Sequence, residues 1–543
     1  MRRFQEGLLP LCLVLVIGAC RTHAGADVER PNILLLVADD LGYADLGIYG
    51  SDIRTPNIDA LARRGMRFTQ FHTAPMCAPT RAMLLSGNNN HVAGMGIQGG
   101  GSGAFAGIPG YEGHLSDRVA PLPGLLRDAG YHTYTVGKWH LGYERDQSPM
   151  AAGFERSFNL LNGAGNHFDA VGFHEGGSRY REDGEETTYP TGRYSTDLYT
   201  DRLIEFIASN RGDGRPFFAF AAYTSPHWPL QVPAEELDRY AGRYDRGYDA
   251  LREERFASLK RAGIVPADAT LPPRNDAIAP WETLSPERRR EESRKMELYA
   301  AMVENLDGHV GRLIDYLKAS GLYDNTLIVF MADNGAAAED FYNVGEFRDY
   351  LRAHYDNRYE NMGQPNSFVS YGPAWAEAGS APFSRHKGYT REGGIVAPMI
   401  VAGPGVASQD VIDRSYLTVM DLAPTFIEIA GAAYPADGSA RPMLGESVAG
   451  YLAGRADRIH DEAYTTLVLH GGRAFVRQGR WKLVTLEPPF SEEAFELFDV
   501  EADPGETRNL AGEEPETYRE LLALWRTKRA ELGIVLQSDL ASP

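Results

Sequence analysis

Short apolar, β-branched runs alternate along the chain with segments of helical periodicity. This alternation is typical of a parallel β-sheet whose strands are connected by helices. The pattern predicts strands over residues 32–37, 131–136, 217–223 and 326–331 and a helix over 122–128. A further helix is expected after Thr55 and Pro56, which resemble a cap and a first-turn proline, with Gly65 closing it. We therefore expect an α/β fold with a large mixed, mostly parallel sheet sandwiched by helices.

Polar residues that can carry out chemistry follow each of the four predicted strands. In chain order they are Asp39 and Asp40, then Lys138 and His140, then His227, and finally Asp333 and Asn334. Ligands of open α/β sheets bind at the carboxyl ends of the strands. The sequence therefore predicts that these side chains converge at one edge of the sheet.

The character of the chain changes twice after the third strand. Residues 229–296 are rich in charge, with helical segments at 251–261 and 287–295, and predict a solvated helical insertion near the mouth of the site. Beyond about residue 456, short alternating runs, a turn at 503–505 and a helix over 516–532 follow. We expect a main α/β domain over 27–455 and a small C-terminal α+β subdomain with a short antiparallel sheet over 456–543.

The first 26 residues are typical of an export signal. Arg2 and Arg3 precede an apolar stretch over residues 8–19, which is too short to span a membrane as a mature helix. Residues 17–20 resemble a bacterial lipobox, in which Cys20 becomes the lipidated first residue. Residues 24–26 offer a competing A-x-A cleavage site and a soluble product. We prefer the lipobox, because Cys20 directly ends the apolar run, and expect a periplasmic protein or a membrane-anchored lipoprotein at the cell envelope.

Composition narrows the possibilities further. The chain has 543 residues, of which 43% are hydrophobic and 24% charged, values that exclude a disordered, collagen-like or coiled-coil protein. The net charge of −20 gives no reason to expect nucleic acid as a partner, so an anionic substrate requires a local positive site. Of the three cysteines, Cys12 lies in the leader, and Cys20 is either removed with the leader or lipidated as the first mature residue, so a disulfide framework is excluded.

The remaining cysteine lies in a distinctive motif. Residues 77–87 read Cys-Ala-Pro-Thr-Arg-Ala-Met-Leu-Leu-Ser-Gly, and residues 130–140 end in Gly-Lys-Trp-His. The first segment resembles the C-x-P-x-R signature of the sulfatase family, and the second resembles the family's second signature at the expected distance. The likeness extends from Asn32 to the segment around residues 496–509. In detail it is most similar to bacterial arylsulfatases of the soluble Pseudomonas type, and it implies an alkaline-phosphatase-like superfold.

The resemblance implies that a maturation enzyme oxidises Cys77 to formylglycine (3-oxoalanine). A thiol is a poor permanent nucleophile for a sulfate ester, because the enzyme–sulfate would need a second difficult displacement at sulfur. A hydrated aldehyde carries two hydroxyls on one carbon. One attacks sulfur and the other then expels sulfate by carbon–oxygen cleavage, so one hard step becomes two easier ones.

The residues after the first and fourth strands suit a metal ion. Asp39, Asp40, Asp333 and Asn334 are hard oxygen ligands, which favour Ca²⁺ or Mg²⁺ over Zn²⁺. The resemblance implies Ca²⁺, with the residue made from Cys77 as a further ligand. Such a cation neutralises sulfate oxygens and favours the ionised form of the attacking hydroxyl.

The resemblance also assigns roles to basic side chains. Arg81 would hold the formylglycine, and Lys138 and Lys387 would hold substrate oxygens. His227 would protonate the leaving alcohol, and His140 would take a proton from the second hydroxyl as sulfate departs, with Asp333 assisting the first. The neighbouring His386 is a further candidate for substrate contact.

Three functions remain to be compared. The first is hydrolysis of aryl or alkyl sulfates, including sulfated glycans. The second is hydrolysis of phosphonate monoesters or phosphodiesters by relatives of the same superfold, which tend to carry Asp-His where this chain has Asp333 and Asn334. The third is a non-catalytic protein that binds sulfated ligands. The intact nucleophile, metal set and basic ring favour the first, with specificity expected from loops such as 94–113 and 229–296.

Overall fold

A large sheet forms the centre of the computed structural model, which describes residues 30–540. The predicted leader, with Cys12, Cys20 and both candidate cleavage sites, lies outside these residues. Within them the sheet has eleven strands in the order β10-β2-β9-β8-β1-β7-β3-β4-β5-β6, and β11 pairs with β2. The bounds are β1 Asn32–Ala38, β2 Met66–His72, β3 His132–Lys138, β4 Arg156–Leu160, β5 Tyr180–Glu182, β6 Glu185–Thr187, β7 Phe217–Ala222, β8 Thr326–Ala332, β9 Val396–Ala402, β10 Val411–Asp413 and β11 Leu417–Thr418.

The four strands predicted to carry polar ends are neighbours in the middle of this sheet. Strand β1 pairs in parallel with β8 on one side and with β7 on the other, and β7 pairs in parallel with β3. Every residue of β1, β3, β7 and β8 is buried, as expected for parallel strands covered on both faces. Their carboxyl ends therefore meet at one edge, which confirms the predicted convergence.

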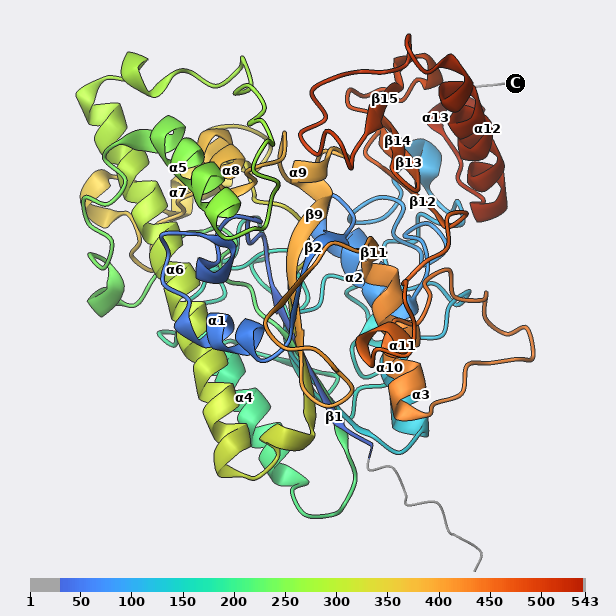
Figure 1. Ribbon diagram of the computed structural model, residues 1–543. Helices are drawn as coiled ribbons and strands as arrows, with labels where there is room; N and C mark the ends of the chain where they lie inside the picture. Colours follow the sequence, from blue (N-terminus) through green and yellow to red (C-terminus); the bar gives the residue numbers. More distant parts are fainter. Residues whose placement is uncertain (1–29, 541–543) are drawn as a thin grey trace, which may run out of the picture. The chain divides into compact units, whose positions relative to one another are not determined.

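Helices cover both faces of the sheet (Figure 1). Helices α1, α4, α5, α6 and α8 lie on one face, and α2, α3, α10 and α11 lie on the other. The bounds are α1 Pro56–Arg63, α2 Cys77–Ser86, α3 Leu122–Asp128, α4 Ser195–Ser209, α5 Gly247–Arg261, α6 Pro286–Ala319, α7 Arg348–His354, α8 Gly372–Gly379, α9 Glu392–Ile395, α10 Leu422–Ala430, α11 Ala449–Leu452, α12 Pro515–Leu532 and α13 Gln537–Leu540. No helix among residues 30–540 is long and apolar enough to cross a membrane.

The ends of α1 differ from the expectation. The hydroxyl of Thr55 donates to Asp59 and does not cap the helix, whereas the carboxylate of Asp307 on α6 accepts from the backbone N–H groups of Asn57 and Ile58. Gly65 does not adopt the left-handed conformation of a helix C-cap. Close packing explains the glycine instead, because a Cβ at this position would lie 2.0 Å from the carbonyl oxygen of Val401. Tertiary contacts therefore terminate this helix, which the local sequence could not reveal.

The expected solvated helical insertion over 229–296 is helical and exposes many of its charged residues, but several of its aromatic side chains are buried. Tyr244, Tyr248 and Trp281 are buried in the main core, and helix α6 continues beside α1 and α4. Even Arg255 is buried, and its guanidinium pairs with Asp45 beside β1. Many charged residues of this segment are exposed, while the rings of Tyr244, Tyr248 and Trp281 pack on Trp375 of α8.

The C-terminal part contains a second sheet. Strands β12 Thr465–His470, β13 Arg473–Gln478, β14 Trp481–Thr485 and β15 Glu496–Asp499 form an antiparallel meander, against which α12 packs. Trp525 of α12 is fully buried in a small core of its own. Phe475 and Val484, on the other face of the meander, belong to the main core. The meander therefore joins the two hydrophobic cores.

Candidate active site

The carboxyl edge of the central strands holds a dense group of buried charges. Asp39 and Asp40 directly follow β1, Lys138 is the last residue of β3, and Asp333 directly follows β8. Each is at most 1% exposed. Buried charges are stable only when they are paired, and these residues do pair with one another.

Cys77 lies at the first position of α2, a helix whose residues are all buried. Its Sγ is 3.4 Å from Asp39 Oδ1 and 3.9 Å from Asp40 Oδ1. Burial raises the pKa of the thiol well above its ordinary value. An unmodified Cys77 would therefore remain a neutral thiol at neutral pH and would be a poor nucleophile.

The carboxylates around Cys77 fit a divalent cation. Ligand atoms of Asp39, Asp40, Cys77 and His227 all lie within 4.8 Å of one another. Asp333 lies outside this group but accepts from the backbone N–H of Asp40 at 3.2 Å. Burial and the neighbouring Asp39 raise the pKa of Asp333 to about 6, because a second negative charge close by and the absence of water both disfavour the ionised carboxylate.

Asn334 adds an oxygen to the same group. Its Nδ2 donates to Asp40 Oδ1 at 2.7 Å, and its buried Oδ1 has no hydrogen-bond partner among the described residues. A buried amide oxygen without a donor costs free energy unless a ligand satisfies it. The donor set of carboxylate and amide oxygens fits a hard cation such as Ca²⁺ or Mg²⁺.

Three cations balance the three carboxylates. Lys138 Nζ lies 2.9 and 2.7 Å from the two Oδ atoms of Asp39, and Lys387 Nζ lies 2.8 Å from Asp40 Oδ2. Arg81 donates to Asp333 Oδ2 from Nη2 at 2.8 Å and from Nε at 3.2 Å. Burial opposes ionisation of Asp40, but Lys387, His227 and Lys138 together hold its pKa well below its ordinary value.

Two histidines complete the group. His227 Nδ1 donates to the Trp228 carbonyl at 2.7 Å, so its Nε2 is the free acceptor, 3.4 Å from Lys387 Nζ and 3.3 Å from Asp40 Oδ2. Burial and the adjacent Lys387 lower the pKa of His227 to about 3. Burial and Lys138 hold the pKa of His140 well below its ordinary value, and its Nδ1 has no partner among the described residues. Both rings are therefore neutral near pH 7.

The backbone is strained at two site residues. Asp40 and His140 adopt left-handed conformations with φ of 65° and 60°, which cost free energy for residues other than glycine. Such strain persists where the surrounding structure fixes the backbone, and it aims both side chains into the group. The predicted strands and turns did not reveal this backbone strain.

Two further residues lie next to or near Lys387. His386 hydrogen-bonds the Lys387 carbonyl at 3.1 Å and packs its ring on Tyr389. Glu339, which the sequence reasoning missed, places Oε1 3.5 Å from Lys387 Nζ. The only sequence feature that could have indicated Glu339 is the acidic pair Glu339–Asp340, a few residues after Asp333.

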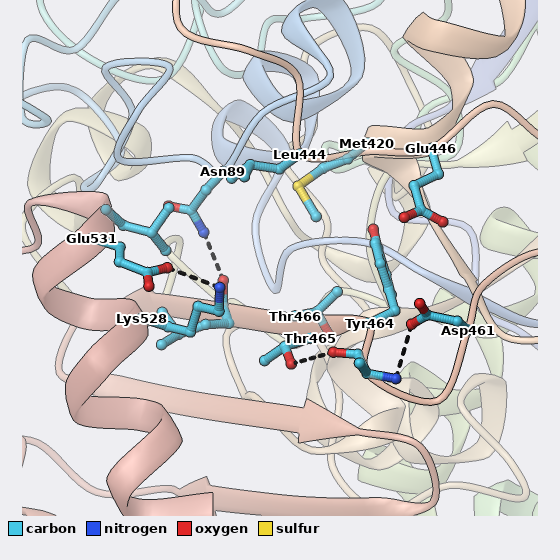
Figure 2. Close-up of a pocket in the computed structure, with 13 residues that line it drawn as sticks. Asn89, Met420, Leu444, Glu446, Asp461, Tyr464, Thr465, Thr466, Lys528 and Glu531 are labelled. Carbon is cyan, nitrogen blue, oxygen red and sulfur yellow. Dashed lines mark hydrogen bonds and ion pairs between the residues drawn. The ribbon is translucent and has the colours of Figure 1, made fainter.

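A separate pocket of about 320 Å³ opens beside strand β12 and helix α12 (Figure 2). Its polar side chains are already satisfied: Asn89 donates to the Leu467 carbonyl, and Lys528 pairs with Glu531. None of the predicted site residues lines it. The chemistry is therefore concentrated at the sheet edge.

Comparisons with known proteins agree with this geometry. The sulfatase family model matches residues 31–432, and a model for the C-terminal part of N-sulphoglucosamine sulphohydrolase matches 385–529. An uncharacterized sulfatase of Schizosaccharomyces pombe is 39% identical over 95% of this chain and 96% of its own length. An arylsulfatase of Klebsiella aerogenes is 40% identical over 77% of this chain and 90% of its own.

Solved structures show the same architecture. The crystal structure of Ps i-CgsB bound to k-i-k-neocarrahexaose has a TM-score of 0.65 and 24% identity, covering 94% of both chains. The chain thus has the alkaline-phosphatase-like fold of these enzymes, with a large, mostly parallel sheet between helices. The matched family model spans most of the chain, and the buried Cys77, carboxylates and cations lie where the strands end. This chain belongs to the sulfatase family and is a sulfuric ester hydrolase.

Proposed function

We propose that the protein hydrolyses sulfate monoesters with a formylglycine made from Cys77 and with Ca²⁺ held by Asp39, Asp40, Asp333 and Asn334. The observation that supports this most is the position of Cys77 Sγ, 3.4 Å from Asp39 within a buried ring of three carboxylates and three cations. The hydrated formylglycine supplies two hydroxyls on one carbon, one to attack sulfur and one to release sulfate. The cation, when bound, supplies positive charge for the sulfate oxygens and the residue at position 77.

The lysines bind the sulfate group in this proposal. Lys138 and Lys387 now share the carboxylates of Asp39 and Asp40, and both ammonium groups are buried. Charge-assisted donors in a site without water stabilise negative charge on oxygen more strongly than donors in solution do. Arg81 fixes Asp333 with two N–H groups and also donates to the Lys138 carbonyl at 2.9 Å, so it holds the ends of β8 and β3 together.

Proton transfer involves both histidines. The neutral Nε2 of His227 lies 3.4 Å from the Lys387 ammonium, so this pair can supply a proton to the leaving oxygen. His140, neutral and with a free Nδ1, can accept the proton of the second hydroxyl. Asp333, held in place by two N–H groups of Arg81, can take part in deprotonating the attacking hydroxyl.

Export belongs to the proposal as well. The apolar run over residues 8–19 supports secretion, and Cys20 at its end supports lipid attachment at the cell envelope. A dedicated maturation enzyme would convert Cys77 in the same cell. The mass of the mature N-terminal peptide tests this part: a lipidated Cys20 supports it, and a soluble chain beginning at Asp27 contradicts it.

Activity of the mature protein tests the whole proposal. The protein purified from its native host should release sulfate from 4-nitrophenyl sulfate, and Cys77→Ala should abolish turnover. Phosphonate monoesters serve as the comparison, because Asn334 supports sulfate ester hydrolysis over phosphonate ester hydrolysis. A higher kcat/KM for the phosphonate ester, or turnover that survives Cys77→Ala, would contradict the proposal.

A further inference from the structure

An aromatic cluster adjoins the charged site. Its rings belong to Phe173, Trp228, Phe341 and Phe347, which we call the aromatic wall. Ring centroids are 5.7 Å apart for Phe173–Trp228, 5.3 Å for Trp228–Phe341, 5.4 Å for Phe341–Phe347 and 5.0 Å for Phe173–Phe347. Each ring thus contacts two others edge to face, an arrangement that aromatic side chains favour.

Two segments hold most of the wall: 166–178, and 338–355, which includes helix α7. They are tied together, because Tyr350 donates to the Val171 carbonyl at 2.9 Å and Tyr355 donates to the Gly172 carbonyl. Trp228 and the buried Phe368 and Leu351 support the rings from the interior. The wall is therefore a fixed surface built from packed side chains.

One ring of the wall contacts a predicted site residue, and residues adjacent to the wall in the chain or in the cluster reach two more. The Trp228 ring lies 4.2 Å, centroid to centroid, from the ring of His227. Ala164 packs in the same cluster, and a Cβ on the preceding Gly163 would lie 2.4 Å from the His140 ring. Glu339, two residues before Phe341, contacts Lys387 Nζ at 3.5 Å. The wall therefore borders the side of the site where the leaving oxygen would receive its proton.

This border carries apolar surface exposed to solvent. Val344 and Val171, on the same two segments, are 63% and 36% exposed and are among the few large hydrophobic residues that face water. The indole Nε1 of Trp228 is buried and has no acceptor among the described residues. Exposed apolar residues beside a functional site, together with an unsatisfied buried donor, point to a ligand with an apolar body and an oxygen atom.

The charges of the two segments exclude a polyanion. They contain six acidic residues and two arginines: Asp169, Glu175, Glu339, Asp340, Glu346 and Asp349 against Arg348 and Arg352. Arg348 donates to the adjacent Asp349, and Arg352 donates to the Tyr342 carbonyl and to Asn343. A second sulfate group near these segments would meet like charge without a free cation.

We propose that the aromatic wall binds the leaving group of the substrate and selects an aromatic or otherwise apolar alcohol that carries one sulfate. The proposal rests on the proposed function, since it places the leaving group beside His227. The alcohol part of the ester packs against Phe173, Phe341 and Phe347, while the sulfate enters the ring of lysines and arginine. Sugars with several sulfates are disfavoured by the acidic residues and gain little from the apolar rings.

Substrate selectivity of the mature holoenzyme tests the wall. We would measure kcat/KM for 4-nitrophenyl sulfate, N-acetyl-D-glucosamine 6-sulfate and D-glucosamine-2-N,6-O-disulfate in the wild type and in Phe341→Ala and Phe347→Ala. Loss of one ring should lower kcat/KM for the aryl sulfate about tenfold, mainly through KM, and change the value for the monosulfated sugar less than about threefold. Phe490→Ala, which removes a half-buried ring packed on Phe495 and Trp525 in the C-terminal part, is the control and should leave the ratio unchanged.

The outcomes separate this proposal from the proposed function. A wild type that cleaves none of the three esters contradicts the proposed function itself. The proposal for the aromatic wall is contradicted if the wild type prefers the disulfated sugar. It is also contradicted if the variants lower both kcat/KM values by the same factor. Either result leaves the proposed sulfatase activity intact. Phe341→Leu keeps an apolar side chain and serves if Phe341→Ala does not fold; it should reduce the aryl-to-sugar ratio less than Phe347→Ala does.

Discussion

Lys138 Nζ donates to both carboxylate oxygens of Asp39, at 2.9 and 2.7 Å, although strand β7 separates the strands that carry them. Both side chains are fully buried. The contact joins a candidate metal ligand to a candidate sulfate donor. It therefore couples the position of the cation to the position of the substrate.

Replacing this lysine should impair chemistry severely. Lys138→Met leaves Asp39 without its counter-charge and removes a donor to the sulfate, so we expect kcat/KM to fall by about 100-fold or more. Steady-state kinetics with 4-nitrophenyl sulfate measures the loss. Lys318→Met, in a side chain that is 54% exposed, is the matched control and should retain normal activity. If the Lys138→Met protein has a nearly normal kcat/KM, Lys138 does not take part in catalysis.

Metal removal provides an independent test of the carboxylate group. A chelator should abolish turnover, and Ca²⁺, the ion that the resemblance implies, should restore it more fully than Mg²⁺. Zn²⁺ should restore it poorly, because the donors are carboxylate and amide oxygens without a thiolate pair. Asn334→Ala should raise the Ca²⁺ concentration needed for half-maximal activity by about 10–100-fold. Isothermal titration of the chelated protein with Ca²⁺ gives the affinity directly. Full activity after exhaustive chelation would contradict the metal assignment.

Lys482 should be essential for stability. It is fully buried on β14, with Nζ 2.6 Å from Glu392 Oε1 and 2.9 Å from Glu506 Oε1. Burial alone would raise the pKa of Glu392, but Lys482 and His72 hold it well below its ordinary value. Lys482→Met leaves two buried carboxylates without this partner and should lower the free energy of unfolding by about 3–5 kcal/mol.

Urea unfolding measures that change. The control is Lys528→Met, which breaks the exposed pair with Glu531 and should cost less than about 1 kcal/mol. Glu392 begins α9, five residues after Lys387, so kcat of folded Lys482→Met protein should also fall. Equal stability losses in the two variants would show that the buried network contributes no more than a surface pair.

His460 should make stability depend on pH. Burial disfavours its charged form, but hydrogen bonds to Asp421 at 3.0 Å and Glu446 at 2.9 Å raise its pKa above 6.5. A raised pKa means that the protonated ring stabilises the folded state below the ordinary pKa, and that this contribution disappears as the pH rises through the folded-state value. The difference in Tm between wild type and His460→Gln should therefore be larger at about pH 6 than at about pH 9. A constant difference would contradict the pairing.

Much of the site was predictable because its residues follow hydrophobic strands. The runs that form β1, β3, β7 and β8 were recognisable from the sequence, and parallel pairing brings their carboxyl ends together. The burial of Tyr244, Tyr248 and Trp281 within residues 229–296 was not predictable, since it depends on tertiary packing against Trp375 of α8. The cap that Asp307 provides to α1 and the contact of Glu339 with Lys387 likewise arise only from tertiary packing. Sequence spacing carries no information about such contacts.

The mass of the tryptic peptide from Phe68 to Arg81 tests the central claim most directly. Protein purified from the native host and active on 4-nitrophenyl sulfate should contain an aldehyde, or its hydrate, in place of the Cys77 thiol. The peptide mass then falls by the difference between CH₂SH and CHO, or shows the added water of the hydrate. An unmodified thiol at Cys77 in protein that turns over a sulfate ester would contradict the account.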